Sequence, residues 1–485
     1  MFSLHLQYRN IVNEREAKNE VCWKKKELAS LYQHYETNKF QFAVIYGRRR
    51  IGKTALINEF LKDKKAIYFA AMEENKEDNL RRFSAAINHF MDPDIISESS
   101  FSSFEATFRQ IAELAKKERV ILVIDEYPYL AQAYPAVSSM LQSYIDKEYS
   151  NTNMFLILCG SSMSFMEYQV LGYKSPLYDR RTVQYKLKPF TLKEAQEMLP
   201  HYSKKEAFEI NSIVGGIPKY LNMISDQVPV IENIKATFLN SDSLLFEEPN
   251  NLLKQELRDP STYNSIINAI ANGASKMNQI ATTAKVASGA VYTYLKNLID
   301  LGILSKKVPV TEMDKPKSKK TIYVISDGMF RFWYTFVGKN ISLIEAGYAD
   351  LVAKQIEQGL SNFLGPSFEQ LSQEYLWQHM MDKEIVPEYF RRLGYWWGTD
   401  KKAKKQVEMD IVGISIDNLA GFFGGCKWKN EPISKSILET LIYHSSLFTY
   451  PKKYYYLLFS EVGFTDECKK LAKKVNCHLI SFSEM

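Results

Sequence analysis

The sequence lacks a Cys-x-x-Cys pair and has no run of about 18 consecutive apolar residues. The first absence removes any sign of a zinc ribbon or a disulfide framework, and the second excludes a membrane-spanning helix. The five cysteines are scattered: Cys22, Cys159, Cys426, Cys468 and Cys477. The first ten residues lack both the apolar core and the small-residue cleavage site of a secretory signal. We therefore expect a cytoplasmic protein with no membrane partner.

The sequence also has little excess of one charge sign and few glycines and prolines. A formal net charge of +6 over 485 residues is mild and by itself predicts no partner. Only 21 glycines and 16 prolines occur, so no low-complexity segment is expected. Lysines do cluster at residues 24–26, 317–320 and 401–405. Such runs could hold phosphate groups of a nucleic acid, or they could simply form solvated surface.

The length exceeds that of one compact core and predicts several domains. Short apolar runs alternate with amphipathic stretches in the first part, which favours an α/β core with a parallel sheet over residues 1–190. A helical lid is expected over residues 191–255. Three helices followed by two strands then predict a winged helix over residues 256–340, and a second, smaller α/β domain fills residues 341–485.

The segment after the first apolar strand carries the pattern G-x-x-x-x-G-K-T and leads into a helix. In such a P-loop, backbone N–H groups and the helix N-terminus hold the β-phosphate of a nucleotide. Lys53 would bridge the β- and γ-phosphates, and the Thr54 hydroxyl would ligate Mg²⁺. We assign the whole loop to ATP binding: Gly47, Arg48, Arg49, Arg50, Ile51, Gly52, Lys53, Thr54 and Ala55.

A second apolar strand ends in two carboxylates, Asp125 and Glu126. Asp125 would orient the Mg²⁺ shell, and Glu126 would polarise the water that attacks the γ-phosphate. Because chance matches to the P-loop pattern occur, this second half of the site is what predicts an ATPase. The expected cofactors are ATP and Mg²⁺.

Two further polar pairs are candidates for the same site. Ser161 and Ser162 follow another apolar strand, where they could contact the γ-phosphate or its attacking water, or merely cap the strand end. Arg180 and Arg181 could stabilise the transferring phosphoryl group, either in their own chain or from a neighbouring subunit. The alternative for these arginines is a surface salt bridge.

Five ordered motifs carry a family resemblance: GRRRIGKT at 47–54, ILVIDEYPYL at 121–130, CGSSMSFM at 159–166, SPLYDRRT at 175–182 and GGIPKYL at 215–221. With them the chain resembles the AAA-type "archaeal ATPase" group of prokaryotes, which is related to STAND signalling ATPases. This resemblance implies an AAA-like P-loop NTPase core, a winged helix and a restriction-endonuclease-like C-terminal domain. It also implies that Gly216, Pro218 and Lys219 begin a lid helix that senses the nucleotide, with a tight turn as the alternative.

Nucleases with that C-terminal fold place an Asp at one strand end and an acid, one residue and a lysine on the next strand, to bind metal and activate water. Asp410 and Lys427 match this pattern, but Gly425 stands where the acid is expected. Glu369, and Glu408 on the same strand face as Asp410, could compensate. We expect a degenerate domain that binds a partner or dimerises and not an active nuclease, since fold does not imply function.

These features lead to one principal hypothesis and two alternatives. The principal hypothesis is a nucleotide-driven switch that reports its state to double-stranded DNA, to a protein partner or to a homo-oligomer through the C-terminal domains. The first alternative is an ATP-regulated, metal-dependent DNA nuclease. The second is a signalling module that binds ATP without hydrolysing it.

Overall fold

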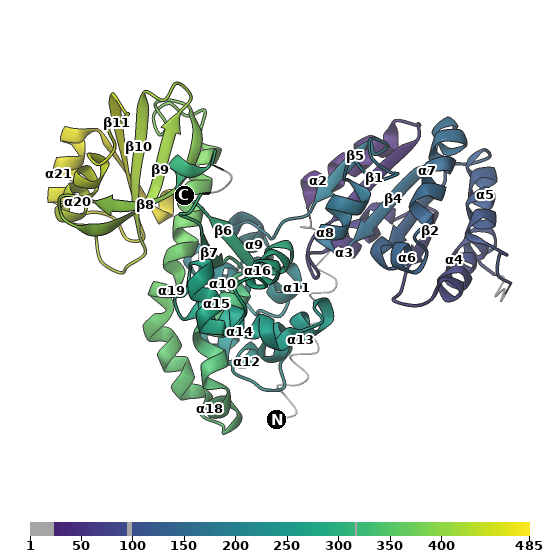
Figure 1. The fold of residues 1–485 in the computed structure, drawn as a ribbon, viewed down its shortest axis with the longest axis horizontal. Helices are drawn as coiled ribbons and strands as arrows, with labels where there is room; N and C mark the ends of the chain where they lie inside the picture. The colour runs from purple at the N-terminus through teal and green to yellow at the C-terminus, as the bar shows by residue number, and fades with distance from the viewer. Residues whose placement is uncertain (1–23, 95–98, 316–317) are drawn as a thin grey trace. The chain divides into compact units, whose positions relative to one another are not determined.

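The structure is a computed structural model that describes residues 24–94, 99–315 and 318–485. The chain divides into two compact units (Figure 1). The first holds the chain up to Met198 together with Gly216–Asn222, and the second holds Leu199–Gly215 and Met223–Met485. The four domain ranges given by the sequence remain predictions, because this division is coarser than they are.

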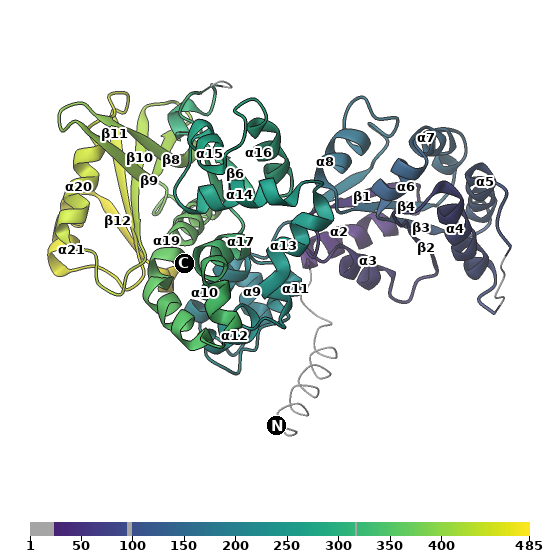
Figure 2. The same ribbon diagram turned by 60° about the horizontal axis from the view of Figure 1, so that its bottom comes forward.

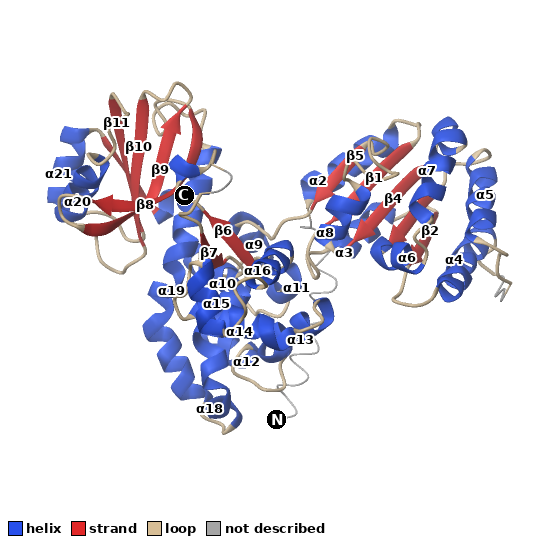
Figure 3. Cartoon of the chain, in the orientation of Figure 1, coloured by secondary structure: helices blue, strands red, loops and turns tan. Residues whose placement is uncertain are grey.

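The first unit is built on a five-stranded parallel sheet, which confirms the predicted α/β core (Figure 3). Its strands are β1 Gln41–Tyr46, β2 Ala66–Ala70, β3 Ile121–Asp125, β4 Phe155–Gly160 and β5 Val183–Lys186. Their order is β2-β3-β4-β1-β5, so β4 lies between β1 and β3. Because all neighbours are parallel, the carboxyl ends of these strands meet at one edge, where ligands bind in open α/β sheets.

The helices of this unit are α2 Lys25–Glu36, α3 Lys53–Leu61, α4 Lys76–Met91, α5 Phe104–Ala115, α6 Tyr127–Ala133, α7 Val137–Lys147, α8 Met163–Phe165, α9 Leu192–Met198 and α11 Pro218–Leu221. Helices α4, α5, α6 and α7 pack against the sheet around an apolar core. Side chains cap several of them: Asn75 accepts from a backbone N–H of α4, and Ser103 does so for α5. The helix predicted behind Thr191 is α9, whose first turn is closed by reciprocal bonds between Thr191 and Glu194.

The second unit begins with helices and a small hairpin. Its elements are α10 Lys204–Val214, α12 Val230–Thr237, α13 Leu244–Glu256, α14 Pro260–Ala271, α15 Met277–Ala284, α16 Val291–Asp300, β6 Leu304–Lys307 and β7 Ile322–Ile325. The strands β6 and β7 are antiparallel, so three helices and then two strands follow one another as the sequence predicted. In the part of the chain that the structure describes, no helix is both long enough and apolar enough to cross a membrane.

The loop between β6 and β7 makes contacts that the sequence did not predict. Val310 is fully buried in the same apolar core as residues of the C-terminal sheet. The Asp314 carboxylate is ion-paired with Arg392 on that sheet, and Lys315 and Lys320 both pair with Glu312. The polar composition of the loop gives no sign of these contacts. They are made by one buried valine and by the ion pair of Asp314.

A mixed five-stranded sheet forms the C-terminal part (Figure 2). Its elements are α17 Gly328–Phe332, α18 Ile341–Glu345, α19 Ala349–Gln378, β8 Phe390–Asp400, β9 Lys405–Ser415, β10 Ala420–Lys427, α20 Lys435–Ser445, β11 Lys453–Ser460, α21 Asp466–Val475 and β12 Cys477–Ser481. The order is β12-β11-β10-β9-β8, in which β8, β9 and β10 are antiparallel and β10, β11 and β12 are parallel. The predicted smaller α/β domain is therefore present, and its sheet is mixed.

Candidate functional site

The P-loop connects the end of β1 to the start of α3. Gly47 has a φ of 155°, and a Cβ there would lie 2.8 Å from the Leu187 carbonyl oxygen. Gly52 has a φ of 90° and precedes the first residue of α3. Lys53 is buried, and its Nζ donates to the carbonyl oxygens of Gly47 and Arg48 at 3.0 and 3.1 Å. The loop thus has the tight backbone turn and the inward-facing ammonium group that a phosphate cradle requires.

The other residues of the loop are anchored around it. The guanidinium group of Arg49 donates to the Tyr129 hydroxyl at 2.8 Å, and that of Arg50 lies over the Tyr220 ring at 5.8 Å. Ile51 is buried, and Arg48 is half-buried. Ala55 is exposed on the first turn of α3.

The two carboxylates predicted from the sequence lie beside the loop. Asp125 ends β3 and is buried, and its Oδ2 accepts from the Thr54 hydroxyl at 3.3 Å. Its Oδ1 accepts from the backbone N–H of Glu126 at 2.9 Å. Thr54 and Asp125 are therefore brought together from α3 and β3. Their hard oxygen atoms are the donor type that Mg²⁺ prefers.

Glu126 is held by the neighbouring strand. It adopts a left-handed backbone conformation with a φ of 48° immediately before α6. Its Oε2 accepts from the backbone N–H and the hydroxyl of Ser161, at 3.2 and 2.9 Å. The order of strands explains this contact, since β4, which precedes Ser161, is adjacent to β3. Ser162, one residue further, is half-buried at the start of α8 and makes no cap bond to that helix.

The two predicted arginines behave differently from each other. Arg180 forms a bidentate ion pair with Asp146, with Nε and Nη2 each 2.8 Å from a carboxylate oxygen. This hydrogen-bonded arginine lowers the pKa of the Asp146 carboxyl. Arg181 is half-buried, and its charge opposes the burial that raises the pKa of Tyr46 at the end of β1. The surface ion pair considered from the sequence is thus present for Arg180.

The segment Gly216–Asn222 belongs to the same compact unit as the P-loop. Gly216 has a φ of 66°, and its carbonyl oxygen accepts from the Phe190 backbone N–H at 2.7 Å. Pro218 is the first residue of α11, and Lys219 is exposed beside it. Since Tyr220 contacts Arg50, this short helix lies next to the P-loop, and its nucleotide-sensing role stays a prediction.

Sequence reasoning missed a tyrosine in the site. The Tyr68 hydroxyl, from β2, donates to Asp125 Oδ2 at 2.6 Å. Tyr68 lies more than fifty residues before Asp125, and only the pairing of β2 with β3 brings the two together. The signal that could have found it is a polar residue near the end of the strand beside the carboxylates. Buried Cys159 also lies close enough that Asp125 contributes to a raised thiol pKa, whose main cause is burial.

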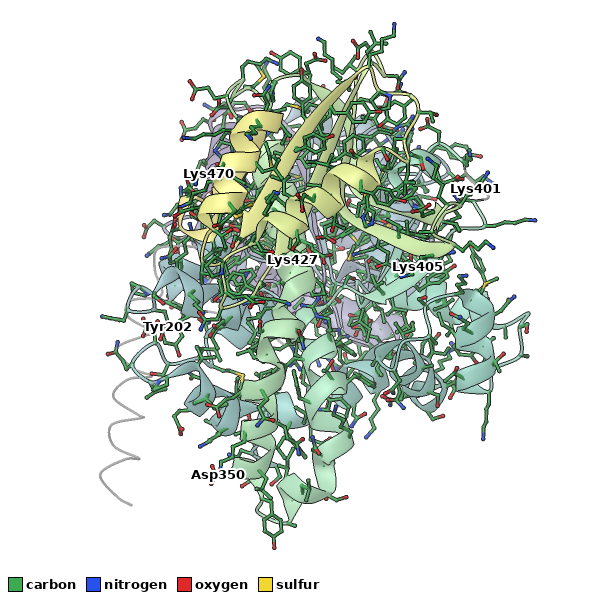
Figure 4. All side chains as sticks on the ribbon, turned by 90° about the vertical axis from the view of Figure 1, so that its left-hand side faces the viewer. Tyr202, Asp350, Lys401, Lys405, Lys427 and Lys470 are labelled. Atoms are coloured by element: carbon green, nitrogen blue, oxygen red, sulfur yellow. The ribbon has the colours of Figure 1, made fainter. Side chains whose placement is uncertain are left out.

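The C-terminal sheet brings Asp410 and Lys427 together. Lys427 ends β10 (Figure 4), and its Nζ lies 3.7 Å from Asp410 Oδ2, which also accepts from the Cys426 backbone N–H at 2.8 Å. Glu408 is exposed two residues before Asp410. Within the described residues, no group of three or more His, Cys, Asp or Glu side chains could hold a metal ion. The sheet therefore provides one acid–lysine pair but no evident cluster of carboxylates.

Glu369 of α19 lies near this pair. Burial and then the Asp410 charge raise the pKa of Glu369 to about 7, although Lys307 and Lys427 oppose the shift. The ammonium group of Lys307, from β6, lies 3.5 Å from the centre of the Tyr395 ring. Of these two cations, Lys427 belongs to the predicted motif and Lys307 does not, and both partly offset the negative charge of Glu369 and Asp410.

Replacing Glu369 by glutamine is expected to stabilise the protein at pH 8 and to have little effect at pH 5. The pKa of the Glu369 carboxyl is about 7 in the folded protein, whereas the ordinary pKa of a glutamate is 4.5. Between these values the folded state binds more protons than the unfolded state, so stability falls as pH rises. At pH 8 the free energy of unfolding of the glutamine variant should exceed that of wild type by at most about 3 kcal/mol. Thermal unfolding of both proteins across this pH range measures it, with exposed Glu357→Gln on the same helix as the control.

Comparison with known proteins locates two family regions in the chain. Residues 24–224 match the model of an ATPase domain predominantly from Archaea. Residues 333–439 match a family of archaeal and bacterial proteins of unknown function. An uncharacterized protein of Methanocaldococcus jannaschii, MJECL04, is 33% identical over 408 residues, which is 84% of this chain and 87% of that protein. An uncharacterized ATP-binding protein of that organism, MJ0423, is 48% identical over 42 residues, or 9% of this chain and 71% of that protein.

Solved structures show more distant likenesses. The Walker-type ATPase PABY2304 of Pyrococcus abyssi is 19% identical, with 65% of this chain and 96% of that chain covered and a TM-score of 0.48. The ORC2 protein of Aeropyrum pernix is 12% identical, with 68% and 95% covered and a TM-score of 0.41.

Proposed function

This chain belongs to the family defined by an ATPase domain found predominantly in Archaea, and on that premise we propose that it binds ATP with Mg²⁺ and hydrolyses it as a nucleotide-driven switch coupled to double-stranded DNA. One observation carries the proposal. Lys53, Asp125 and Glu126 converge at the carboxyl edge of the parallel sheet, beside a glycine turn that opens a helix. Function is assigned from these groups, because the fold alone does not determine it.

Lys53 and the start of α3 bind the phosphates in this proposal. The Lys53 ammonium group donates to two backbone carbonyls in the structure, and phosphate oxygens are stronger acceptors for a charged donor. The phosphates would therefore take the place of those carbonyls. Thr54 and Asp125 fit Mg²⁺, which is usually held by one or two protein carboxylates together with the substrate phosphates. Asp125 alone therefore supplies enough protein carboxylate for such a site.

Glu126 is the group that orients and deprotonates the attacking water. Ser161 donates twice to one oxygen of its carboxylate, which leaves the other oxygen for the water. The left-handed backbone at Glu126 is uncommon for this residue type, and the Glu126 side chain makes no cap bond to the helix that follows. Mg²⁺, when bound, neutralises the charge that develops on the transferring phosphoryl group.

Two features support DNA as the coupled partner. The three helices and two strands of residues 260–325 follow the order of a winged helix, whose third helix here is α16. Tyr292 on that helix is 60% exposed. In addition, Lys401, Lys402, Lys404 and Lys405 are all exposed at the turn between β8 and β9; Figure 4 labels the first and the last of them. Such a basic turn suits contact with phosphates.

The test is ATP turnover by the purified chain with Mg²⁺, measured with and without double-stranded DNA at two salt concentrations. Turnover that requires Mg²⁺ and rises with DNA at low salt supports the proposal. A turnover rate that is the same with and without DNA at both salt concentrations would contradict the DNA coupling and favour a protein partner. Nucleotide binding without turnover would favour the non-hydrolysing module, and DNA cleavage in the same reactions would favour the nuclease.

A further inference from the structure

Tyr68 is the third hydrogen-bond donor to the Asp125 carboxylate, after the Thr54 hydroxyl and the Glu126 backbone N–H, and it comes from the neighbouring strand β2. In the parallel pairing of β2 with β3, Ala70 lies opposite Asp125 and Tyr68 lies opposite Val123. The tyrosine side chain reaches along the sheet, and its hydroxyl donates to Asp125 Oδ2 at 2.6 Å. That length is typical of a hydroxyl bound to an ionised carboxylate.

The phenol is a permanent donor in this position. Burial raises the pKa of Tyr68, and the neighbouring Asp125 charge raises it further. The hydroxyl therefore keeps its proton throughout the physiological pH range. Phe69, the next residue, is buried and stacks on Phe83 at 4.8 Å, so the strand that carries the tyrosine is firmly packed.

Three hydrogen bonds restrict the orientation of the Asp125 carboxylate. Glu126 N–H binds Oδ1, while the hydroxyls of Thr54 and Tyr68 bind Oδ2. A carboxylate offers about four acceptor positions, so three donors leave roughly one for the metal shell. The Tyr68 contact is the shortest of the three, and it comes from a strand that contributes no other group to the predicted site.

We propose that Tyr68 is a positioning residue of the Mg²⁺ site, whose hydroxyl fixes the Asp125 carboxylate in the orientation that meets the metal shell together with Thr54. This inference rests on the proposed binding of ATP with Mg²⁺. Groups that orient the ligands of a metal usually matter for affinity by about tenfold to a hundredfold. Tyr68 acts through Asp125 and touches neither nucleotide nor water in this role.

Replacing Tyr68 by phenylalanine removes the hydroxyl and keeps the ring. The Mg²⁺ concentration that gives half-maximal binding of a fluorescent ATP analogue is expected to rise about tenfold. Binding of the analogue in EDTA should not change, and turnover at saturating Mg²⁺ should stay within about threefold of wild type, because Glu126 and Lys53 are untouched. The matched control is Tyr149→Phe, which removes a buried hydroxyl that donates to the Phe108 carbonyl oxygen at 3.0 Å. It should leave the Mg²⁺ dependence unchanged.

The outcomes separate this inference from the proposed function. An unshifted or lower Mg²⁺ requirement in the Tyr68→Phe protein, with a normal wild type, overturns the positioning role alone. An equal shift in the Tyr149→Phe protein would assign the effect to general loosening of the domain and also overturn it. A wild type that shows no Mg²⁺-dependent nucleotide binding overturns the proposed function, and the inference with it.

Discussion

A Glu126→Gln protein is expected to bind ATP as wild type does and to lose ATP turnover by roughly 100- to 10,000-fold, the usual contribution of a positioned general base. Glutamine can still accept from Ser161, which donates to this side chain at 2.9 Å, so the local structure should be kept. What it cannot do is accept the proton of the attacking water. The loss should therefore fall on kcat, while nucleotide binding stays intact.

The companion variant, Lys53→Ala, should mainly weaken nucleotide binding, whereas Glu126→Gln should mainly lower kcat. It removes the buried ammonium group of the P-loop, so nucleotide affinity itself should fall, by about tenfold to a hundredfold or more. Single-turnover kinetics and equilibrium binding of a fluorescent analogue separate the two effects. Glu77→Gln, an exposed carboxylate in the same unit, is the matched control and should leave both quantities unchanged. Full turnover in the Glu126→Gln protein would mean that another group activates the water.

Replacing Trp428 by alanine is expected to destabilise the second unit by about 3–5 kcal/mol, the usual cost of deleting a large aromatic side chain from a core. Trp428 follows β10 and is 5% exposed. Its ring centre lies 4.5 Å from that of Phe208 on α10, 5.1 Å from Phe368 on α19 and 4.9 Å from Phe482 near the C-terminus. One side chain thus joins three segments that are far apart in the sequence.

Urea unfolding followed by tryptophan fluorescence and circular dichroism measures this loss. The control is Trp377→Ala on α19, because Trp377 is 46% exposed and should cost much less. Basal ATP turnover should persist below the unfolding transition, since the cluster belongs to the second unit and the predicted catalytic groups belong to the first. Equal destabilisation by the two substitutions would contradict the assignment of Trp428 as the centre of the cluster.

The sequence predicted the core strands and the P-loop because both are local patterns. β1, β3 and β4 are short apolar runs bounded by polar residues, and each is buried along its whole length. The glycines and the lysine of the loop lie within eight residues of one another, so their chemistry can be read without knowing the fold. The sequence did not predict the burial of Val310 after β6, since no pattern near this residue indicates the surface against which it packs.

The sequence alone predicts a P-loop pattern ahead of a helix and a buried strand that ends at Asp125, with Glu126 directly after it, because these features depend on neighbouring residues. The side chains that bind those carboxylates could be identified only from the folded chain. Strand order placed Ser161 against Glu126 and Tyr68 against Asp125, and folding gave Arg180 a partner in Asp146. Each of these contacts joins residues more than thirty positions apart, and such pairs depend on the packing of the whole unit and not on any local pattern.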